Sequence, residues 1–263
     1  MAEKAAIEGR EADIVIVANA FGVDPVWRSG QSAWLGVAAD AGARGFEVRR
    51  ELFATDADAS HDALARLGAQ ARGRGLWCVY STPACLYIDG RLDACALETA
   101  LAEADALGAR FVKLQLGTFT GRANAAAIAR ISAQRRSRVL VENGQRAIDD
   151  ALERFVALFD ALAAEGAPDI LGMTFDIGNW HWTGEAPLAA AHALAGHVEY
   201  IHCKAVTGSG ARRFACAPAA DDPSFSSIFA VLPQRVPRAI EFPLDERSLA
   251  DDARRRVAWL AAA

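Results

Sequence analysis

The 263-residue sequence has little of what would mark a secreted, membrane or nucleic-acid-binding protein. Its five cysteines are odd in number and form no Cys-x-x-Cys pair, which argues against a disulfide framework and favours reduced thiols in a cytoplasmic protein. No apolar run is long enough to span a bilayer, and the charged start does not resemble a secretory signal. The formal net charge of -5 lacks the basic excess typical of nucleic-acid binding.

Signature motifs of several large enzyme classes are missing as well. No Gly-x-Gly-x-x-Gly follows the first apolar run, which disfavours a dinucleotide-binding fold. There is no Walker A lysine loop, no His-Glu-x-x-His and no Gly-x-Ser-x-Gly.

What the sequence has is a regular alternation of two patterns. Short apolar runs recur roughly every thirty residues, the length of a βαβ unit. Between them, stretches such as 94–107 and 151–164 carry apolar residues at three- and four-residue intervals and predict helices. Eight such units without a break in composition predict one α/β domain over residues 1–263, a (β/α)8 or TIM barrel with a parallel sheet. The expected strands are 14–17, 45–48, 76–80, 111–116, 139–142, 171–176, 198–202 and 239–242.

Four consecutive runs carry a possible metal ligand at or near the end. Barrel active sites lie at the carboxyl ends of the strands, where we expect Glu142, Asp176, His202 and Glu241 to meet. A single acid at a strand end is usually a helix cap or an ion-pair partner. Three carboxylates together would repel one another without a cation. The set therefore predicts one divalent metal ion, Mn²⁺, Mg²⁺, Co²⁺ or Zn²⁺.

Residues two positions apart on a strand share a face, so neighbours of the ligands can reach the same pocket. Lys204 follows His202 by two, and a lysine there could stabilise an oxyanion. For each such residue a solvated or barrel-filling ion pair is the alternative. The candidates for substrate contact are Glu47, Lys113, Gln115 and Lys204, with Arg49 beside Glu47.

These segments resemble the xylose-isomerase-like barrel superfamily of sugar phosphate isomerases and epimerases over nearly the whole chain. The resemblance rests on 45–52, 141–143, 175–179, 201–204 and 240–242. The blocks 173–182 and 202–206 are similar, more narrowly, to the epimerase of bacterial 2-ketogluconate utilisation.

The resemblance implies a function for the four ligands. In the ketose 3-epimerase branch a Glu, an Asp, a His and a Glu hold the metal in the chain order found here. It implies that the metal chelates a carbonyl and the neighbouring hydroxyl of a small sugar, sugar acid or sugar phosphate. Glu142 and Glu241 would then be the catalytic acid and base, acting through an enediolate. Relatives are often dimers or tetramers, so a homodimer or homotetramer is possible.

One position departs from the family pattern. Asn179 stands three residues after the aspartate, where many relatives have histidine. With only five histidines, the chain does not fit the DNA-repair branch, which holds three zinc ions. Asn179 and His181 are further candidates for substrate contact. We expect His181 and Trp180 in a loop after the sixth strand, where Trp180 could stack on a sugar or pack the loop. Residues 208–213 are expected to form a loop near the pocket.

Two other functions stay open. A dehydratase of the 3-dehydroshikimate type shares this barrel and metal set, and it also begins by removing a proton beside a carbonyl. A barrel can also be retained as a non-catalytic sugar-binding or regulatory protein. Metal uptake and proton exchange would discriminate among the three.

Overall fold

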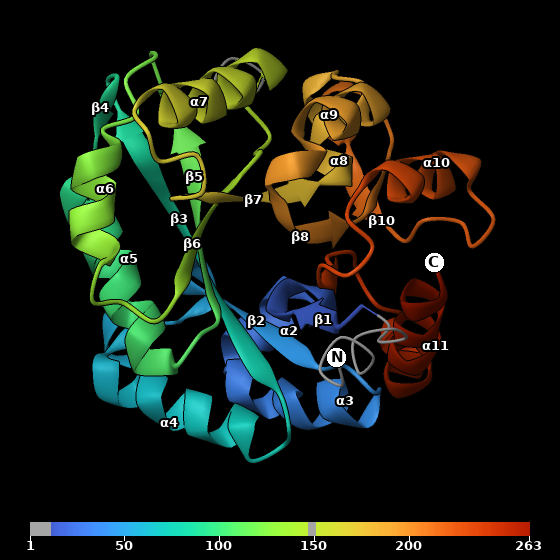
Figure 1. Ribbon diagram of the computed structural model, residues 1–263. Coiled ribbons are helices and arrows are strands. Elements are labelled where there is room, and N and C mark those ends of the chain that lie inside the picture. The colour runs from blue at the N-terminus through green and yellow to red at the C-terminus, as the bar shows by residue number, and fades with distance from the viewer. Residues whose placement is uncertain (1–11, 147–150) are drawn as a thin grey trace, which may run out of the picture.

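The computed structural model describes residues 12–146 and 151–263, and eight of their strands form a closed parallel ring (Figure 1). Each strand pairs with the next around the ring, and the last pairs again with the first. The (β/α)8 barrel predicted from the sequence is thus confirmed. In ring order the strands are β1 (Ile14–Val17), β2 (Gly45–Arg49), β3 (Trp77–Ile88), β5 (Phe111–Gly117), β6 (Arg138–Glu142), β7 (Gly172–Asp176), β8 (Val198–Cys203) and β11 (Arg238–Ile240).

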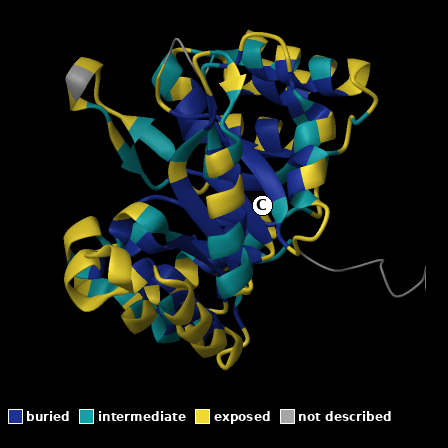
Figure 2. Ribbon diagram, turned by 90° about the vertical axis from the view of Figure 1, so that its left-hand side faces the viewer, coloured by how far each residue is buried: buried dark blue, intermediate teal, exposed yellow. Residues whose placement is uncertain are grey.

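Helices surround the ring, and their outer faces are exposed while the strands are buried (Figure 2). They are α2 (Val23–Ser29), α3 (Leu35–Asp40), α4 (His61–Arg72), α5 (Ala94–Leu107), α6 (Ala125–Ser132), α7 (Leu152–Ala164), α8 (Ile177–Thr183), α9 (Pro187–Leu194), α10 (Pro223–Val231) and α11 (Leu249–Ala262). Short 3-10 turns lie in the connections: η1 (Ala18–Phe21), η2 (Gln31–Trp34), η3 (Arg50–Leu52), η4 (Asp56–Ala59), η5 (Ala195–His197), η6 (Gly210–Arg212) and η7 (Glu246–Ser248).

Helix α5 has the predicted bounds because its sequence carries both end signals. The Asp93 side chain accepts a hydrogen bond from the Ala96 N–H at the start. Gly108 ends the helix with a φ of 72°, a left-handed conformation that glycine adopts without a steric penalty. Helix α7 begins one residue later than the pattern predicts.

Three predicted segments are longer, shorter or more ordered in the structure. Strand β3 continues beyond Tyr80 and pairs antiparallel with β4 (Arg91–Leu92). Strand β11 ends at Ile240, so the placement of Glu241 inside the eighth strand was wrong by one residue. Glu241 stays in line with the ring because its N–H donates to the Cys203 carbonyl at 3.3 Å. The expected loop 208–213 is the turn of an antiparallel hairpin formed by β9 (Ala205–Thr207) and β10 (Phe214–Cys216).

Two layers of side chains fill the ring. The first, which we call the apolar layer, consists of Val15, Val17, Val79, Phe111, Leu140, Tyr200 and Ala239. Two residues further along four of these strands come buried polar side chains, which belong to what we call the charged layer. Because strand residues alternate between faces, both layers point into the barrel. The charged layer consists of Glu47, Arg49, Lys113, Glu142, Asp176, His202, Lys204 and Glu241.

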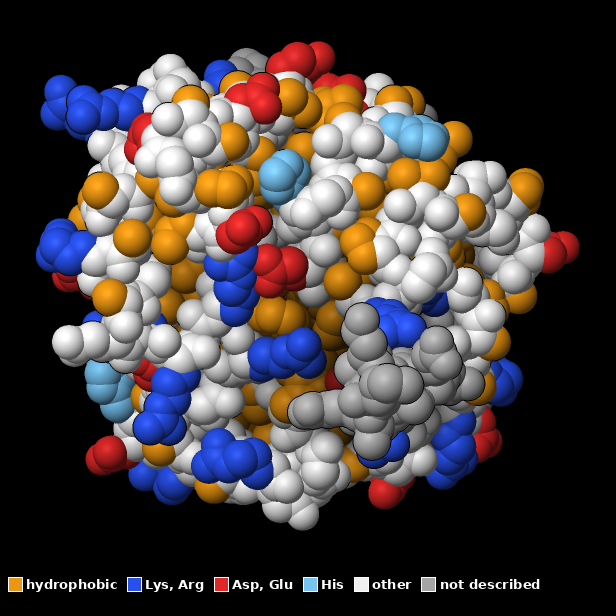
Figure 3. Space-filling model, viewed as in Figure 1, with side chains coloured by type: hydrophobic (Ala, Val, Ile, Leu, Met, Phe, Trp, Pro, Cys, Tyr) orange, Lys and Arg blue, Asp and Glu red, His pale blue; other side chains and the backbone are white. Residues whose placement is uncertain are grey.

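The state of the cysteines, the length of the helices and the surface charge can be seen in the structure. All five cysteines are free. Within residues 12–146 and 151–263, no helix is long and apolar enough to cross a membrane. Acidic and basic side chains are interspersed on the face shown in Figure 3.

Candidate metal centre and active site

The four predicted ligands meet in the charged layer. Each is buried, and each offers a ligand atom within 4.8 Å of those of the others. Donors about 2.0–2.2 Å from one ion lie at most about 4.4 Å apart, so these positions need only a small contraction to bind a cation. The His202 Nδ1 atom lies 2.9 Å from Glu241 Oε2, 3.2 Å from Glu142 Oε1 and 3.7 Å from Asp176 Oδ2.

Two atoms at the centre of this cluster have charged neighbours but no well-oriented hydrogen bond. Among the described residues, His202 Nδ1 and Asp176 Oδ2 are buried and form no hydrogen bond of good geometry, although Lys204 Nζ lies 2.7 Å from Asp176 Oδ2. Buried polar atoms nearly always form hydrogen bonds, and an imidazole nitrogen and a carboxylate oxygen that face two further carboxylates form a donor set for a cation. The residues therefore fit a single divalent ion bound by three carboxylates and one imidazole.

The orientation of His202 is determined from the opposite side of its ring. Its Nε2 atom lies 2.8 Å from Glu47 Oε2, and the Tyr200 hydroxyl donates to the same oxygen at 2.9 Å. A carboxylate on one ring nitrogen fixes the imidazole with the other nitrogen directed at the ligand position. Glu47 is fully buried below the histidine, which favours an orienting role over the predicted substrate contact.

Asp176 is held in place by its neighbours and uses its two oxygens differently. Its Oδ1 accepts the Asn179 N–H at 2.9 Å and so caps α8, while Oδ2 faces the cluster. The Asn143 side chain binds both the N–H and the carbonyl of Asp176, at 2.8 and 2.9 Å. The Asn179 amide donates to the Asn143 carbonyl at 2.7 Å and accepts from Gln145 at 3.1 Å. Asn179 thus joins the ends of β6 and β7.

Three cations pair with the carboxylates. Lys113 Nζ lies 2.8 Å from Glu142 Oε1 and 2.9 Å from Glu47 Oε1. The other two pair with Glu241: Lys204 Nζ lies 2.6 Å from Oε2, and Arg49 Nη1 lies 2.7 Å from Oε1. Charges this deep in a protein are stable only when paired. The Gln115 amide, facing Glu142 across the β5–β6 pairing, adds a hydrogen bond of 2.9 Å to Oε2.

The pairing alters the ionisation of these groups. Burial acts to raise the pKa of Glu241, but Lys204 and His202 outweigh it and hold that pKa well below its usual range. Burial raises the pKa of Asp176, and nearby Glu241 adds to the rise. For His202, burial acts to lower the pKa, but the carboxylate of Glu47 raises it well above the usual value. The negative potential that stabilises a proton on His202 would equally stabilise a divalent cation.

Two predicted residues lie elsewhere. Residues 180–182 belong to helix α8, so the predicted loop was wrong. Trp180 is fully buried against Phe155 and Phe175, which excludes stacking on a sugar. His181 is exposed and lines a separate cavity of about 390 Å³ with Arg213 and Asp222. The structure does not bring His181 to the four ligand residues.

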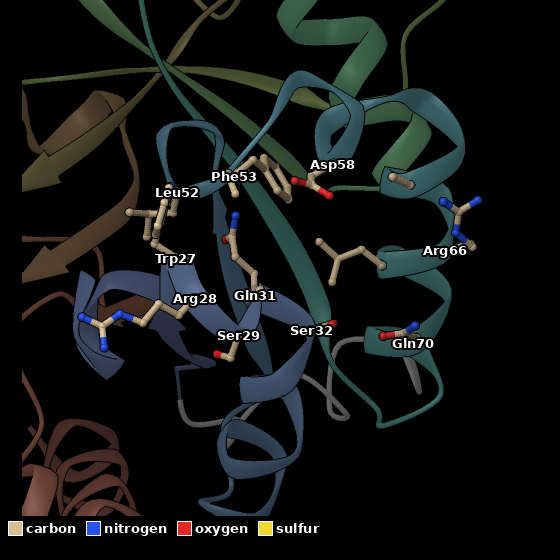
Figure 4. A pocket seen from close by; sticks show the side chains of 14 residues that line it. Trp27, Arg28, Ser29, Gln31, Ser32, Leu52, Phe53, Asp58, Arg66 and Gln70 are labelled. Atoms are coloured by element: carbon tan, nitrogen blue, oxygen red, sulfur yellow. The ribbon is translucent and has the colours of Figure 1, made fainter. Parts of the chain in front are cut away.

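Another cavity, of about 410 Å³, lies between η2 and α4 (Figure 4). Its labelled side chains include Trp27, Phe53 and Arg66, and it contains no residue of the charged layer. Gln31 links the two regions, because its amide donates to the Arg49 carbonyl at 2.8 Å and accepts the Arg49 N–H at 2.9 Å. Gln31, which lines this cavity, therefore supports the end of β2 beside the site.

Sequence reasoning gave too little weight to three residues that support the ligands. Arg49 binds Glu241, Asn143 holds Asp176, and Tyr200 binds Glu47. Two of them had a usable signal, because Arg49 and Tyr200 lie two positions from Glu47 and His202 on the same strand faces. The role of Asn143 depends on the packing of β6 against β7.

Comparison with known proteins rests on structure alone. No protein-family model and no curated protein matches the sequence. The chain is similar to a xylose isomerase domain-containing protein of Salmonella typhimurium, with 15% identity, a TM-score of 0.65 and coverage of 95% of this chain and 98% of the other. The fold that this chain shares with that protein is the TIM barrel.

Two other solved structures show the same likeness. A D-allulose 3-epimerase from Methylomonas sp., in complex with D-allulose, is 15% identical, with a TM-score of 0.66 and coverage of 96% of this chain and 97% of the other. The IolI protein with a zinc atom is 11% identical, with a TM-score of 0.67 and coverage of 95% and 96%. At these identities the likeness shows the fold.

Proposed function

We propose that this protein is a divalent-metal-dependent isomerase or epimerase of a small sugar, sugar acid or sugar phosphate. One observation carries the proposal: three buried carboxylates and one oriented imidazole converge at the ends of four consecutive barrel strands. The similarity in fold to a D-allulose 3-epimerase and to a zinc-binding IolI protein supports both the substrate class and the metal. The narrower sequence resemblance to the epimerase of bacterial 2-ketogluconate utilisation favours a sugar acid.

The ligands would be Glu142, Asp176, His202 and Glu241. A divalent cation in this position would supply Lewis acidity, making the C–H beside a substrate carbonyl more acidic. Mn²⁺, Mg²⁺, Co²⁺ and Zn²⁺ all suit three carboxylates and one imidazole.

The proton is moved by the chain's own carboxylates. Glu142 and Glu241 come from opposite sides of the ligand group, on β6 and just after β11, and both lie near His202 Nδ1. We propose that one removes the proton and the other returns it to the opposite face of the enediolate. Gln115 holds Glu142 Oε2, and Arg49 holds Glu241 Oε1, so each base has a fixed direction.

The residues predicted to contact substrate fall into two groups. Gln115 is partly exposed, and Lys204 lies two residues beyond His202 on the chain; we propose that they contact substrate. Glu47, Lys113 and Asn179 are buried among protein partners, so we assign them to the positioning of the ligands. Substrate contact by His181 stays a prediction from sequence.

Proton exchange in D₂O tests the function directly. Protein loaded with Mn²⁺ and supplied with candidate keto-sugars and sugar acids should incorporate deuterium at the carbon beside the carbonyl, followed by mass spectrometry. Glu142→Gln and Glu241→Gln should each reduce exchange by about 10²–10⁴-fold. Water loss to an unsaturated product that absorbs ultraviolet light would indicate the dehydratase instead. No metal uptake, together with unchanged activity in both variants, would refute the mechanism.

A further inference from the structure

Lysine is rare in this chain and has a particular location. Only three of its 28 basic residues are lysines, and the other 25 are arginines. The two lysines within the described residues, Lys113 and Lys204, are both buried in the charged layer. An ammonium is a compact point charge without the fixed planar fork of a guanidinium. It can therefore take the place of a small cation between carboxylates.

Lys204 lies among the proposed metal ligands. Its Nζ atom is 2.7 Å from Asp176 Oδ2 and 2.6 Å from Glu241 Oε2. These are the same two oxygens that face His202 Nδ1. Lys113 differs, because it joins one ligand oxygen to Glu47, which lies outside the ligand set. The Lys113 ammonium also lies 3.4 Å from His202 Nε2, the ring nitrogen that faces Glu47, whereas the Lys204 ammonium lies between carboxylate oxygens of two ligands.

The structure provides space for Lys204 to reach this position. A Cβ atom on Gly178, in the first turn of α8, would lie 2.5 Å from Lys204 Cγ and 2.9 Å from the Lys204 carbonyl oxygen. Any residue with a side chain at position 178 would displace the lysine stem or the backbone beside it. The glycine thus allows α8 to pack directly over the side chain that enters the carboxylate cluster.

We propose that the Lys204 ammonium is the resident cation of the metal-free site and competes with the divalent metal for Asp176 Oδ2 and Glu241 Oε2. Metal binding displaces Lys204 from these oxygens, and the freed ammonium becomes available to a carboxylate or oxyanion of the substrate. The metal therefore binds before the substrate, and with lower affinity than the four ligands alone would give. This inference rests on the metal site of the proposed function.

Calorimetric titration of chelator-treated, full-length protein with Mn²⁺ tests the competition. Lys204→Met keeps the aliphatic stem and removes the competing charge, so it should bind Mn²⁺ about ten- to a hundredfold more tightly than wild type. Arg49→Met is the matched control, because it removes one positive charge from the same glutamate but from its other oxygen, Oε1. A general change in electrostatic potential predicts equal gains in the two variants, whereas competition predicts a clearly larger gain in Lys204→Met.

Thermal unfolding with and without Mn²⁺ covers the case in which Lys204→Met is too unstable for calorimetry. Mn²⁺ should then raise the midpoint more in this variant than in wild type or Arg49→Met. Equal affinities in all three proteins, or equal gains in both variants, would overturn the inference and leave the proposed function intact. Absence of Mn²⁺ binding by both wild type and Lys204→Met would overturn the proposed function as well. Binding by Lys204→Met alone would support the competition.

Discussion

The apolar and charged layers of the barrel share four strands, on which they lie two residues apart, yet they are stabilised in different ways. Phe111 and Lys113 on β5, and Leu140 and Glu142 on β6, show the change from one layer to the next. The apolar layer needs side chains of the right volume, and its burial is favourable wherever they fit. In the charged layer each ion depends on a particular partner, because an unpaired buried charge is strongly destabilising.

The difference shows how a barrel can carry a polar site without losing its core. Four carboxylates in the charged layer face two lysines, one arginine and one imidazole, so no carboxylate there lacks a cationic neighbour. Tyr200 joins the layers, since its ring packs in the apolar layer and its hydroxyl binds Glu47. A second substitution should therefore recover part of the stability lost in the charged layer, but none of the stability lost in the apolar layer.

Lys113→Met should have the largest effect. It removes the partner shared by Glu47 and Glu142, and breaking a buried ion pair from one side costs about 3–5 kcal/mol of unfolding free energy. Urea unfolding of the metal-free protein measures the loss. Adding Glu47→Gln to the variant should recover part of it, because the double variant no longer buries that negative charge without its lysine partner. A loss below about 1 kcal/mol would mean that the ion pairs are individually dispensable, and the contrast between layers would fail.

Leu140→Ala tests the apolar layer at the position two residues before Glu142. Leu140 is fully buried, and its truncation should cost about 3 kcal/mol through lost burial and the cavity left behind. Leu140→Met, which conserves volume, should cost less than about 1.5 kcal/mol. Urea unfolding should show that no second substitution in the charged layer restores Leu140→Ala. Recovery of its stability by Glu47→Gln would contradict the separation of the layers.

The sequence predicted the residues of the charged layer better than the packing around them. The period of two placed Lys113 and Gln115 on the face of β5 that meets Glu142, because strand alternation depends on local geometry alone. The same rule placed Lys204 on the face of His202. The convergence of the four candidate ligands could be predicted because barrel topology brings strand ends together whatever the helices do.

The features that could not be predicted depend on packing between distant segments. Trp180 follows a strand-end motif as a sugar-stacking residue might, but α8 forms directly after Asp176 and turns Trp180 toward Phe155. The two hydrogen bonds between the Asn143 side chain and the Asp176 backbone depend on how β6 and β7 are placed relative to each other. Neither is encoded by spacing within one segment, since both depend on how neighbouring βα units pack.

Tyr200→Phe probes the contact between the layers. The variant keeps the ring in the apolar layer and removes only the hydroxyl that donates to Glu47 Oε2 at 2.9 Å. A hydrogen bond to a buried charged group contributes about 1.5–3 kcal/mol, so we expect a loss of about 2 kcal/mol in urea unfolding. In the Glu47→Gln background the same change should cost less, because the acceptor is no longer charged. An equal cost in both backgrounds would assign the effect to packing.

Glu165→Gln extends the comparison to a surface charge and should have the smallest effect. The exposed Glu165 carboxylate accepts backbone N–H groups at the start of α6, from Ala125 at 2.6 Å and from Ala123 at 2.9 Å. These hydrogen bonds, the one from Ala125 foremost, hold the pKa of Glu165 below its usual value of 4.5. A lowered pKa in the folded state means that the ionised carboxylate stabilises the protein at pH values above 4.5. This contribution is lost as the pH falls through the folded-state pKa.

At neutral pH the Glu165→Gln variant should lose less than about 1 kcal/mol of unfolding free energy, because solvent screens an exposed charge. The difference from wild type should shrink in acid. Urea unfolding at neutral and acidic pH measures both, with Glu98→Gln on α5 as an exposed control. A loss as large as that of Lys113→Met would show that burial does not set the strength of these charges.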